Sequence, residues 1–202
     1  MQLIGLTRTV ALTTLTFTLS ATASCSQTNG NSFKDTPTPD SQGLSNRVLA
    51  VTYTSEGSNV FYGQGNLDLA LFNFNQAITI DPNYALAYIL RGSVYRNQQN
   101  WDLALADYNK AIELDPNNAL AYTGRGNLYA DQEKWDLVLA DFNQAITIDP
   151  NYAGAYIMRG NIYRDLGDIN KARENLQRAA QLYHNQGDTA GYERAIMMLY
   201  GL

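Results

Sequence analysis

Three arginines, Arg91, Arg125 and Arg159, recur at a constant interval, and Asp107 and Asp141 keep the same interval. A guanidinium is always charged and presents a planar fork of N–H donors, which suits a carboxylate or a phosphate. Two roles are therefore open: a row of anion-binding sites, or ion pairs between the arginines and the aspartates. At about 100° per residue each arginine falls beside the apolar face of its helix. We therefore predict structural Arg–Asp pairs, formed within one unit of the repeat described below or between neighbouring units.

Other residues that often carry chemistry are scarce. The chain has one histidine, His184, and one cysteine, Cys25, so neither an internal disulfide nor a Cys/His zinc cluster can form. A hydrolase built on Asp131 and Asp165 is the enzyme alternative, but the sequence offers no apolar setting that would tune such a pair of carboxylates. We expect no catalysis, no cofactor and no metal. A net charge of −5 also argues against nucleic acid as a partner.

The segments that must position these residues form a repeat. The dodecamer FNQAITIDPNYA stands at 74–85 and again at 142–153, and a looser version, YNKAIELDPNNA, fills 108–119, midway between the two. The resulting period of about 34 residues is typical of a solenoid, whose units are too small to bury their own apolar faces and stack on their neighbours.

The unit at 85–118 predicts a helical hairpin, because apolar residues recur at helical spacing in each half. Between the halves, Asn100 or Asp102 can cap the second helix by accepting a free backbone N–H. Pro116 is expected to end that helix, since the residue before a proline is pushed toward extended geometry.

This unit resembles the tetratricopeptide repeat (TPR), whose pattern of aromatic, glycine, aromatic, alanine, aromatic, alanine and proline is matched in order by Tyr88, Gly92, Tyr95, Ala104, Tyr108, Ala111 and Pro116. The resemblance implies an all-α fold, a right-handed TPR solenoid. Four helix-turn-helix repeats are expected within 47–186, at 51–84, 85–118, 119–152 and 153–186, with a capping helix at 187–202. Thr54 and Ser58 replace the expected tyrosine and glycine of the first repeat, so its first helix should be weak.

The resemblance also implies a non-catalytic interaction module that binds a partner peptide in a concave groove formed by the first helices. Carried over from the family, the groove positions hold amide, basic and apolar side chains: Asn59, Leu86, Ile89, Arg96, Leu120, Asn127, Ile157, Asn161 and Arg164. Asparagine amides can bond a peptide backbone, and the apolar side chains can offer pockets. The cluster with which chaperone-binding TPR domains hold a C-terminal carboxylate is matched only at Asn59. Self-association into a homo-oligomer is the alternative function.

The N-terminus has the layout of a signal peptide at 1–24, with one basic residue, an apolar run and then small residues. Cleavage after Ala23 would release a soluble secreted or periplasmic protein. Cleavage before Cys25, whose setting resembles the lipobox of bacterial lipoproteins, would leave a lipidated cysteine as the new N-terminus. The polar segment at 25–46 is predicted to be a disordered tether. We therefore expect a scaffold or assembly factor anchored by lipid in a bacterial cell envelope.

Overall fold

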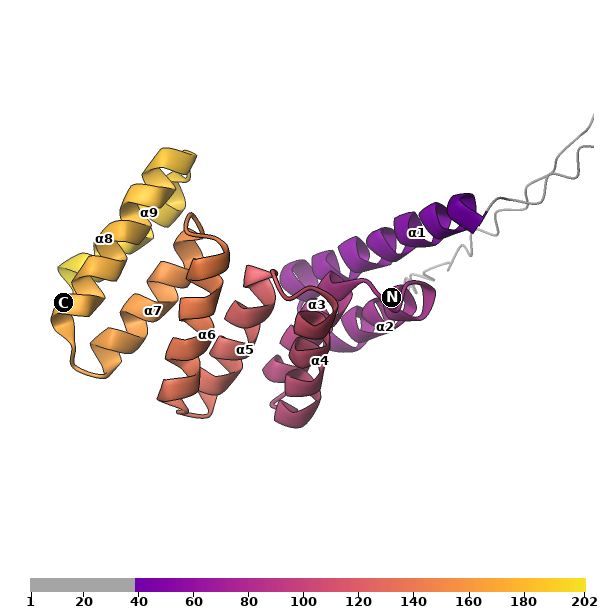
Figure 1. Cartoon of the computed structure of the whole chain (residues 1–202), viewed down its shortest axis with the longest axis horizontal. Coiled ribbons are helices and arrows are strands. Elements are labelled where there is room, and N and C mark those ends of the chain that lie inside the picture. The colour runs from indigo at the N-terminus through magenta and orange to yellow at the C-terminus, as the bar shows by residue number, and fades with distance from the viewer. Residues whose placement is uncertain (1–38) are drawn as a thin grey trace, which may run out of the picture. The chain divides into compact units, whose positions relative to one another are not determined.

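The computed structural model describes residues 39–202, and every regular element in them is a helix (Figure 1). In chain order these are α1 (Pro39–Asn59), η1 (Val60–Gln64), α2 (Leu67–Ile80), α3 (Ala85–Asn97), α4 (Trp101–Leu114), α5 (Ala119–Asp131), α6 (Trp135–Ile148), α7 (Ala153–Asp165), α8 (Ile169–Gln186) and α9 (Thr189–Tyr200). None of the helices described is long and apolar enough to cross a membrane. The signal peptide, Cys25 and most of the expected tether lie outside the described residues.

The helices pack in consecutive pairs. The first helix of each pair, α1, α3, α5 or α7, packs against the second, α2, α4, α6 or α8, and each pair packs on the next. In Figure 1 the pairs follow one another side by side in chain order. The last helix, α9, packs on α8 and closes the array. The predicted all-α array of four helical hairpins with a final capping helix is confirmed.

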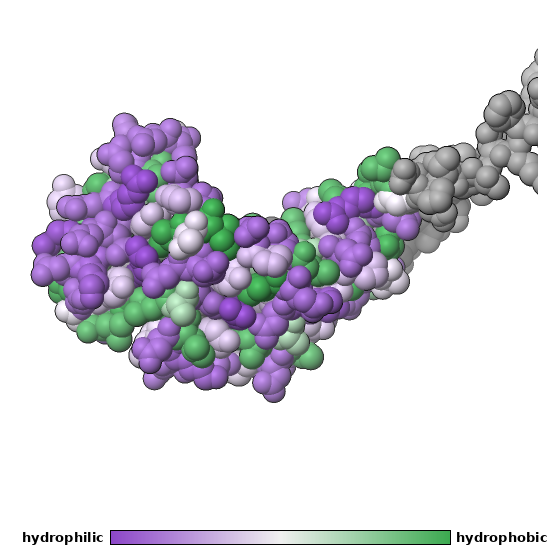
Figure 2. Space-filling view, in the orientation of Figure 1, coloured by the Kyte–Doolittle hydropathy of each residue, from purple (hydrophilic) through white to green (hydrophobic). Residues whose placement is uncertain are grey.

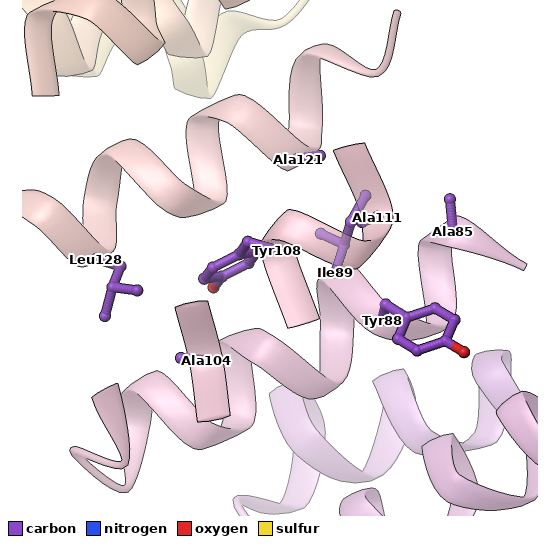
Figure 3. Close-up of a cluster of buried hydrophobic side chains, with 8 residues drawn as sticks. All are labelled: Ala85, Tyr88, Ile89, Ala104, Tyr108, Ala111, Ala121 and Leu128. Atoms are coloured by element: carbon purple, nitrogen blue, oxygen red, sulfur yellow. The ribbon is translucent and has the colours of Figure 1, made fainter. Parts of the chain in front are cut away.

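Small residues and aromatics make the core between the helices. On the second helices, Phe74, Tyr108 and Phe142 are at most 1% exposed, and the alanine or valine four residues before each and the alanine three after it are buried as well. Figure 3 shows one cluster, in which Tyr108 of α4 lies among side chains of α3 and α5. Full burial of one such aromatic side chain contributes about 1.5–3 kcal/mol. Alanine and glycine let the helices approach closely enough for these rings to fill the remaining space.

The helix ends agree with the proline prediction but not with the cap prediction. α4 ends at Leu114, two residues before Pro116, and Asp115 accepts a hydrogen bond from the backbone N–H of Asn117 in the turn. Asn100 occupies the N-cap position of α4, but its side chain donates to Gln98 Oε1 at 3.2 Å and caps nothing. The predicted cap is therefore wrong. Among the residues that the structure describes, the side chains that cap helices are Asn66, Asp168 and Asp188, on α2, α8 and α9.

The first helix is longer and more regular than its sequence predicts. α1 begins at Pro39, so residues 39–46, expected in the tether, are helical. The two residues that depart from the repeat pattern bond within the helix: Thr54 donates to the carbonyl of Ala50 at 2.8 Å, and Ser58 to that of Thr54 at 2.9 Å. Gly57 lies so close to Phe74 that a Cβ there would meet the ring at 2.6 Å. Packing on α2 therefore offsets the weak helix propensity of this segment.

Candidate binding groove

The repeated arginines form clamps that join three helices. Arg91 of α3 donates from Nε and Nη2 to the two carboxylate oxygens of Asp107 on α4, at 2.8 and 2.7 Å. Its Nη1 donates to Asn75 Oδ1 of the preceding repeat at 2.7 Å. The hydrogen bonds to Asp107 raise the pKa of Arg91 above its ordinary value. Arg91 thus links its own hairpin to the hairpin before it.

The next repeat has the same clamp. Arg125 bonds both oxygens of Asp141 at 2.9 and 2.8 Å, and reaches Asn109 Oδ1 at 2.7 Å. The predicted structural Arg–Asp pairs are confirmed. The asparagine partner was missed, although Asn75, Asn109 and Asn143 also recur with the period of the repeat and carried that signal. The predicted groove residue Asn127 follows Arg125 by two residues, which corresponds to about 200° around the helix. The arginine and the predicted groove residue therefore lie on nearly opposite sides of α5.

A pocket of about 640 Å³ lies where the C-terminal halves of α3 and α5 meet η1 and the start of α4. We call it the groove pocket, and its lining residues are Phe61, Tyr62, Ser93, Arg96, Asn97, Gln99, Trp101, Asn127 and Asp131. The lining is mainly polar, with aromatic rings on the side formed by η1 and α4. Tyr62 is 71% exposed, so most of its ring is open to a ligand.

An ion pair spans the groove pocket between neighbouring repeats. Arg96 Nε on α3 lies 2.5 Å from Asp131 Oδ2 on α5, and Arg96 Nη2 lies 3.3 Å from Asp131 Oδ1. Both side chains are about one third exposed, at 35% and 34%. Deeper in the pocket, Ser93 Oγ lies 3.1 Å from the hydroxyl of Tyr108. Burial raises the pKa of that hydroxyl above its ordinary value, so it remains a neutral hydrogen-bonding group at physiological pH.

Five of the nine predicted groove residues lie in three different settings. Arg96 and Asn127 line the groove pocket together. Leu120 is 47% exposed and lines a second pocket, of about 530 Å³, beside Tyr152. Ile89 and Ile157 are only 5% and 3% exposed and belong to the hydrophobic core, as Figure 3 shows for Ile89. Neither isoleucine therefore has a side chain open to a ligand.

The remaining predicted residues lie apart from the groove pocket. Asn59 is exposed at the end of α1, and Leu86 is half-buried on α3. Arg164 is exposed and bonds the neighbouring Asp165 at 3.0 Å. Asn161 is half-buried on α7, and its Oδ1 is a buried acceptor with no hydrogen-bond partner among the described residues.

One residue of the groove pocket, Asp131, was assigned another role from the sequence, and a second, Trp101, was not among the predicted groove residues. Asp131 was considered only as a possible catalytic carboxylate. It lies one position beyond the residue that is one repeat after Arg96, and it pairs with that arginine. Opposite charges at the ends of adjacent first helices were the available signal. Trp101, at the start of α4, packs against the core of α3 and α4, and its remaining surface lines the pocket.

Across residues 39–202, no three histidine, cysteine or acidic side chains gather where they could hold a metal ion. The groove pocket offers amide, hydroxyl and guanidinium donors, carboxylate and amide acceptors, and aromatic surface. These groups suit the backbone and side chains of a peptide.

Sequence comparison identifies the repeats directly. Residues 59–99 and 92–133 match the family described as TPR repeat, and residues 119–152 and 142–174 match the tetratricopeptide repeat. The comparison with curated proteins found no match.

Solved structures show the same fold. A structure of Pseudomonas aeruginosa pilF superposes with a TM-score of 0.62 and 17% identity, covering 78% of each chain. The first TPR domain of Spaghetti (RPAP3), bound to the HSP90 peptide SRMEEVD, gives 0.54 and 23%, over 60% of this chain and 95% of that one. The Arabidopsis OM64 TPR domain gives 0.54 and 21%, over 59% and 98%. With four matched segments running from 59 to 174 and paired helices throughout, the chain belongs to the tetratricopeptide repeat family.

Proposed function

We propose that this TPR protein–protein interaction module binds a peptide segment of a partner protein in the groove pocket. The observation that carries the proposal is the convergence of Tyr62, Arg96 and Asn127, from three successive repeats, on one open pocket. Side chains from several repeats in one pocket suit a ligand long enough to cross repeat boundaries, as a peptide is.

The lining indicates how such a peptide would be held. The amide of Asn127 can donate to a peptide carbonyl and accept from a peptide N–H at the same time. Tyr62 and Trp101 offer flat apolar surface with a polar edge, which suits the side chains of a peptide at low entropic cost. The Arg96–Asp131 pair presents both signs of charge within one site, so binding does not depend on a strongly charged ligand.

The Spaghetti domain supports peptide binding by analogy, since that TPR domain was solved with the HSP90 peptide SRMEEVD. The present chain keeps only Asn59 of the cluster that holds a C-terminal carboxylate in chaperone-binding members. An internal segment of the partner therefore fits this chain better than a C-terminus.

The proposal also includes the envelope location. It rests on the signal-like layout of 1–24 and on Cys25, the single cysteine, directly after small residues. A lipid on Cys25 would tether the array to a membrane and confine its partners to that compartment. Metabolic labelling with a radiolabelled fatty acid tests this part: label should enter the wild-type chain and be absent from Cys25→Ser. Equal labelling of the two would refute lipidation at Cys25.

Peptide binding is tested by affinity capture from native membranes with two matched double variants. Tyr62→Ala/Asn127→Ala removes two groove-pocket side chains, and Leu137→Ala/Gln144→Ala changes exposed positions of α6 outside that pocket. A partner retained by the wild type and the α6 variant but lost by the groove variant supports the proposal. A partner retained by all three refutes it, provided that circular dichroism shows all variants folded.

Self-association is the second candidate, because both ends of the array expose apolar side chains. Leu44 and Val48 on α1 are 69% and 66% exposed, and Met197 and Tyr200 on α9 are 68% and 88% exposed. Figure 2 shows hydrophobic surface, in green, at the α1 end of the array. Light scattering over a concentration series tests this candidate. A mass that stays at that of one chain at every concentration excludes it.

A further inference from the structure

The arginine clamp of the fourth repeat lacks a carboxylate. Arg159 stands where Arg91 and Arg125 stand, but Asn175 replaces the aspartate. Arg159 Nε donates to Asn175 Oδ1 at 2.7 Å, and Nη1 donates to Asn143 Oδ1 at 2.6 Å. The Nη2 group, which meets the second carboxylate oxygen in the other two clamps, has no hydrogen-bond acceptor among residues 39–202.

Asn175 cannot supply the missing acceptor in this arrangement. Its Nδ2 donates to the backbone carbonyl of Lys171 at 2.7 Å, and an amide nitrogen has no lone pair to offer a guanidinium. The positive charge of Arg159 is therefore not neutralised by its own hairpin. In the second and third repeats Asp107 and Asp141 neutralise the equivalent charge at salt-bridge distances of 2.7 and 2.8 Å.

A second cation lies beside the open clamp. The guanidinium carbon of Arg159 is 5.5 Å from the ring centre of Tyr156, and that of Arg178 is 5.9 Å from the same ring centre. No described carboxylate forms a salt bridge with either arginine. Two guanidinium groups without a salt-bridge partner among the described carboxylates therefore lie near the ring of Tyr156, on the hairpin of α7 and α8.

The net charge of the fourth repeat is positive, in agreement with the excess of positive charge around Tyr156. Residues 153–186 contain five basic and three acidic residues, a net charge of +2, whereas the first three repeats carry −3, −1 and −3. The fourth repeat is thus the basic repeat of an acidic array. A surface of this kind attracts and orients an acidic partner.

We infer that Arg159, Tyr156 and Arg178 form a second binding site, which takes a carboxylate side chain of an acidic peptide from another protein. The chain itself shows which chemistry the clamp prefers, because the two equivalent arginines hold carboxylates through paired N–H···O bonds. Nη2 of Arg159 donates a hydrogen bond to an oxygen of the incoming carboxylate, and Arg178 adds positive charge from the neighbouring helix.

This acidic-peptide site is separate from the groove pocket. Arg159 and Tyr156 lie on α7 and Arg178 lies on α8, and neither helix contributes a residue to the groove pocket. None of the three proposed residues lines the groove pocket. A partner can therefore occupy both surfaces at once, and the inference does not depend on what the groove pocket binds.

The test is fluorescence anisotropy on the full chain with a labelled oligoglutamate peptide and an oligoglutamine peptide of the same length. The oligoglutamate peptide should bind. The oligoglutamine peptide should bind at least about tenfold more weakly, because it has no carboxylate to form the charge-assisted hydrogen bond. Asn175→Asp supplies the missing carboxylate within the chain. That variant should lose at least about tenfold in affinity and unfold at a higher temperature.

Two further variants separate the site from general charge attraction. Arg173→Gln removes an exposed positive charge of α8 that belongs to no clamp and should leave the affinity within about twofold of wild type, as expected for a screened surface charge. Asp141→Asn together with Gln144→Arg gives the third repeat the open clamp and the second cation of the fourth, and should add a binding equivalent. Equal affinity of wild type and Asn175→Asp would overturn the inference. So would binding of inorganic phosphate or of anionic phosphatidylglycerol vesicles through Arg159 without binding of the oligoglutamate peptide.

Discussion

Tyr108 of the second repeat packs directly against the backbone of Gly124 in the third. A Cβ built on Gly124 would lie 2.5 Å from Cε1 of the Tyr108 ring, closer than non-bonded carbon atoms approach each other, and 3.0 Å from Cδ1. The ring is fully buried, so it has no room to withdraw. The stacking distance between these repeats is therefore set by a residue with no side chain.

Gly124→Ala should destabilise the protein by about 2 kcal/mol, as overpacking a buried contact does. Gly63→Ala is the matched control, because a Cβ there meets nothing within 4 Å and the residue also lies in a helix. Alanine in an open helical position is stabilising by up to about 1 kcal/mol relative to glycine. Urea denaturation measures both, and a Gly124→Ala variant as stable as wild type would contradict the packing described here.

Replacing Glu133 by glycine should stabilise the protein. Glu133 has a left-handed backbone, with φ of 56°, at the turn between the helices of the third repeat. The equivalent turns of the first and fourth repeats use Gly65 and Gly167, with φ of 65° and 83°. Relief of this strain should raise the free energy of unfolding by about 1 kcal/mol. The reverse change, Gly167→Glu, should lower it by a similar amount, and equal stability of both variants and wild type would refute the strain.

Asp107→Ala should lower stability by about 2 kcal/mol, because Nε and Nη2 of Arg91 lose their acceptors in a partly buried site. Asp107→Asn should cost less, since Arg159 keeps one bond to Asn175 in the same setting. Thermal unfolding gives the order of the two variants. Affinity of the groove pocket for a partner should not change with either variant, and a loss of affinity without a loss of stability would contradict the structural role of the clamp.

Much of the fold follows from local chemistry that recurs with the period of the repeat. The hairpins, the helix ends before Pro116 and its equivalents, and the Arg91–Asp107 type of pair all depend on residues within one repeat or its nearest neighbour. The early start of α1 at Pro39 was not predicted, because its polar residues carry no helical pattern. The cap at Asn100 was wrong because two side chains in the same turn compete, and Gln98 is the partner that Asn100 bonds.

The groove was harder to predict than the fold, because the position of a residue along a helix gives only the direction in which its side chain points. Ile89 and Arg96 share the first-helix face of α3, yet Ile89 is 5% exposed while Arg96 reaches Asp131 at the surface. How far neighbouring repeats cover a position depends on their stacking, which a single repeat does not encode. The contribution of η1, with Tyr62 at the pocket edge, also depends on the unusual end of the first helix.

The stability of the protein should fall at alkaline pH partly because of Tyr108. Burial raises the pKa of its hydroxyl, whereas an unfolded tyrosine ionises near pH 10. Above about pH 10 the unfolded chain releases this proton and the folded chain keeps it, so the free energy of unfolding decreases as pH rises. Below that pH the residue contributes no pH dependence of this kind.

Tyr108→Phe should reduce the alkaline loss by up to about 1.4 kcal/mol per pH unit. Phenylalanine is the resident side chain at the same position of the first and third repeats, as Phe74 and Phe142, so the ring still fits. Ser93 keeps its bond to the carbonyl of Ile89 at 3.0 Å. Denaturation curves at a series of alkaline pH values measure the slope, and identical slopes for wild type and variant would contradict this account.

The central claim is that the groove pocket is the surface to which a partner peptide binds. The most direct measurement places a photo-crosslinking amino acid at Asn127, inside the pocket, or at Gln144, exposed on α6 and outside it. After irradiation of native membranes, crosslinked peptides are identified by mass spectrometry. We predict one recurrent partner segment attached at position 127 and absent at position 144. Crosslinks to that partner at position 144 with none at position 127 would contradict the claim and move the binding surface to the second helices.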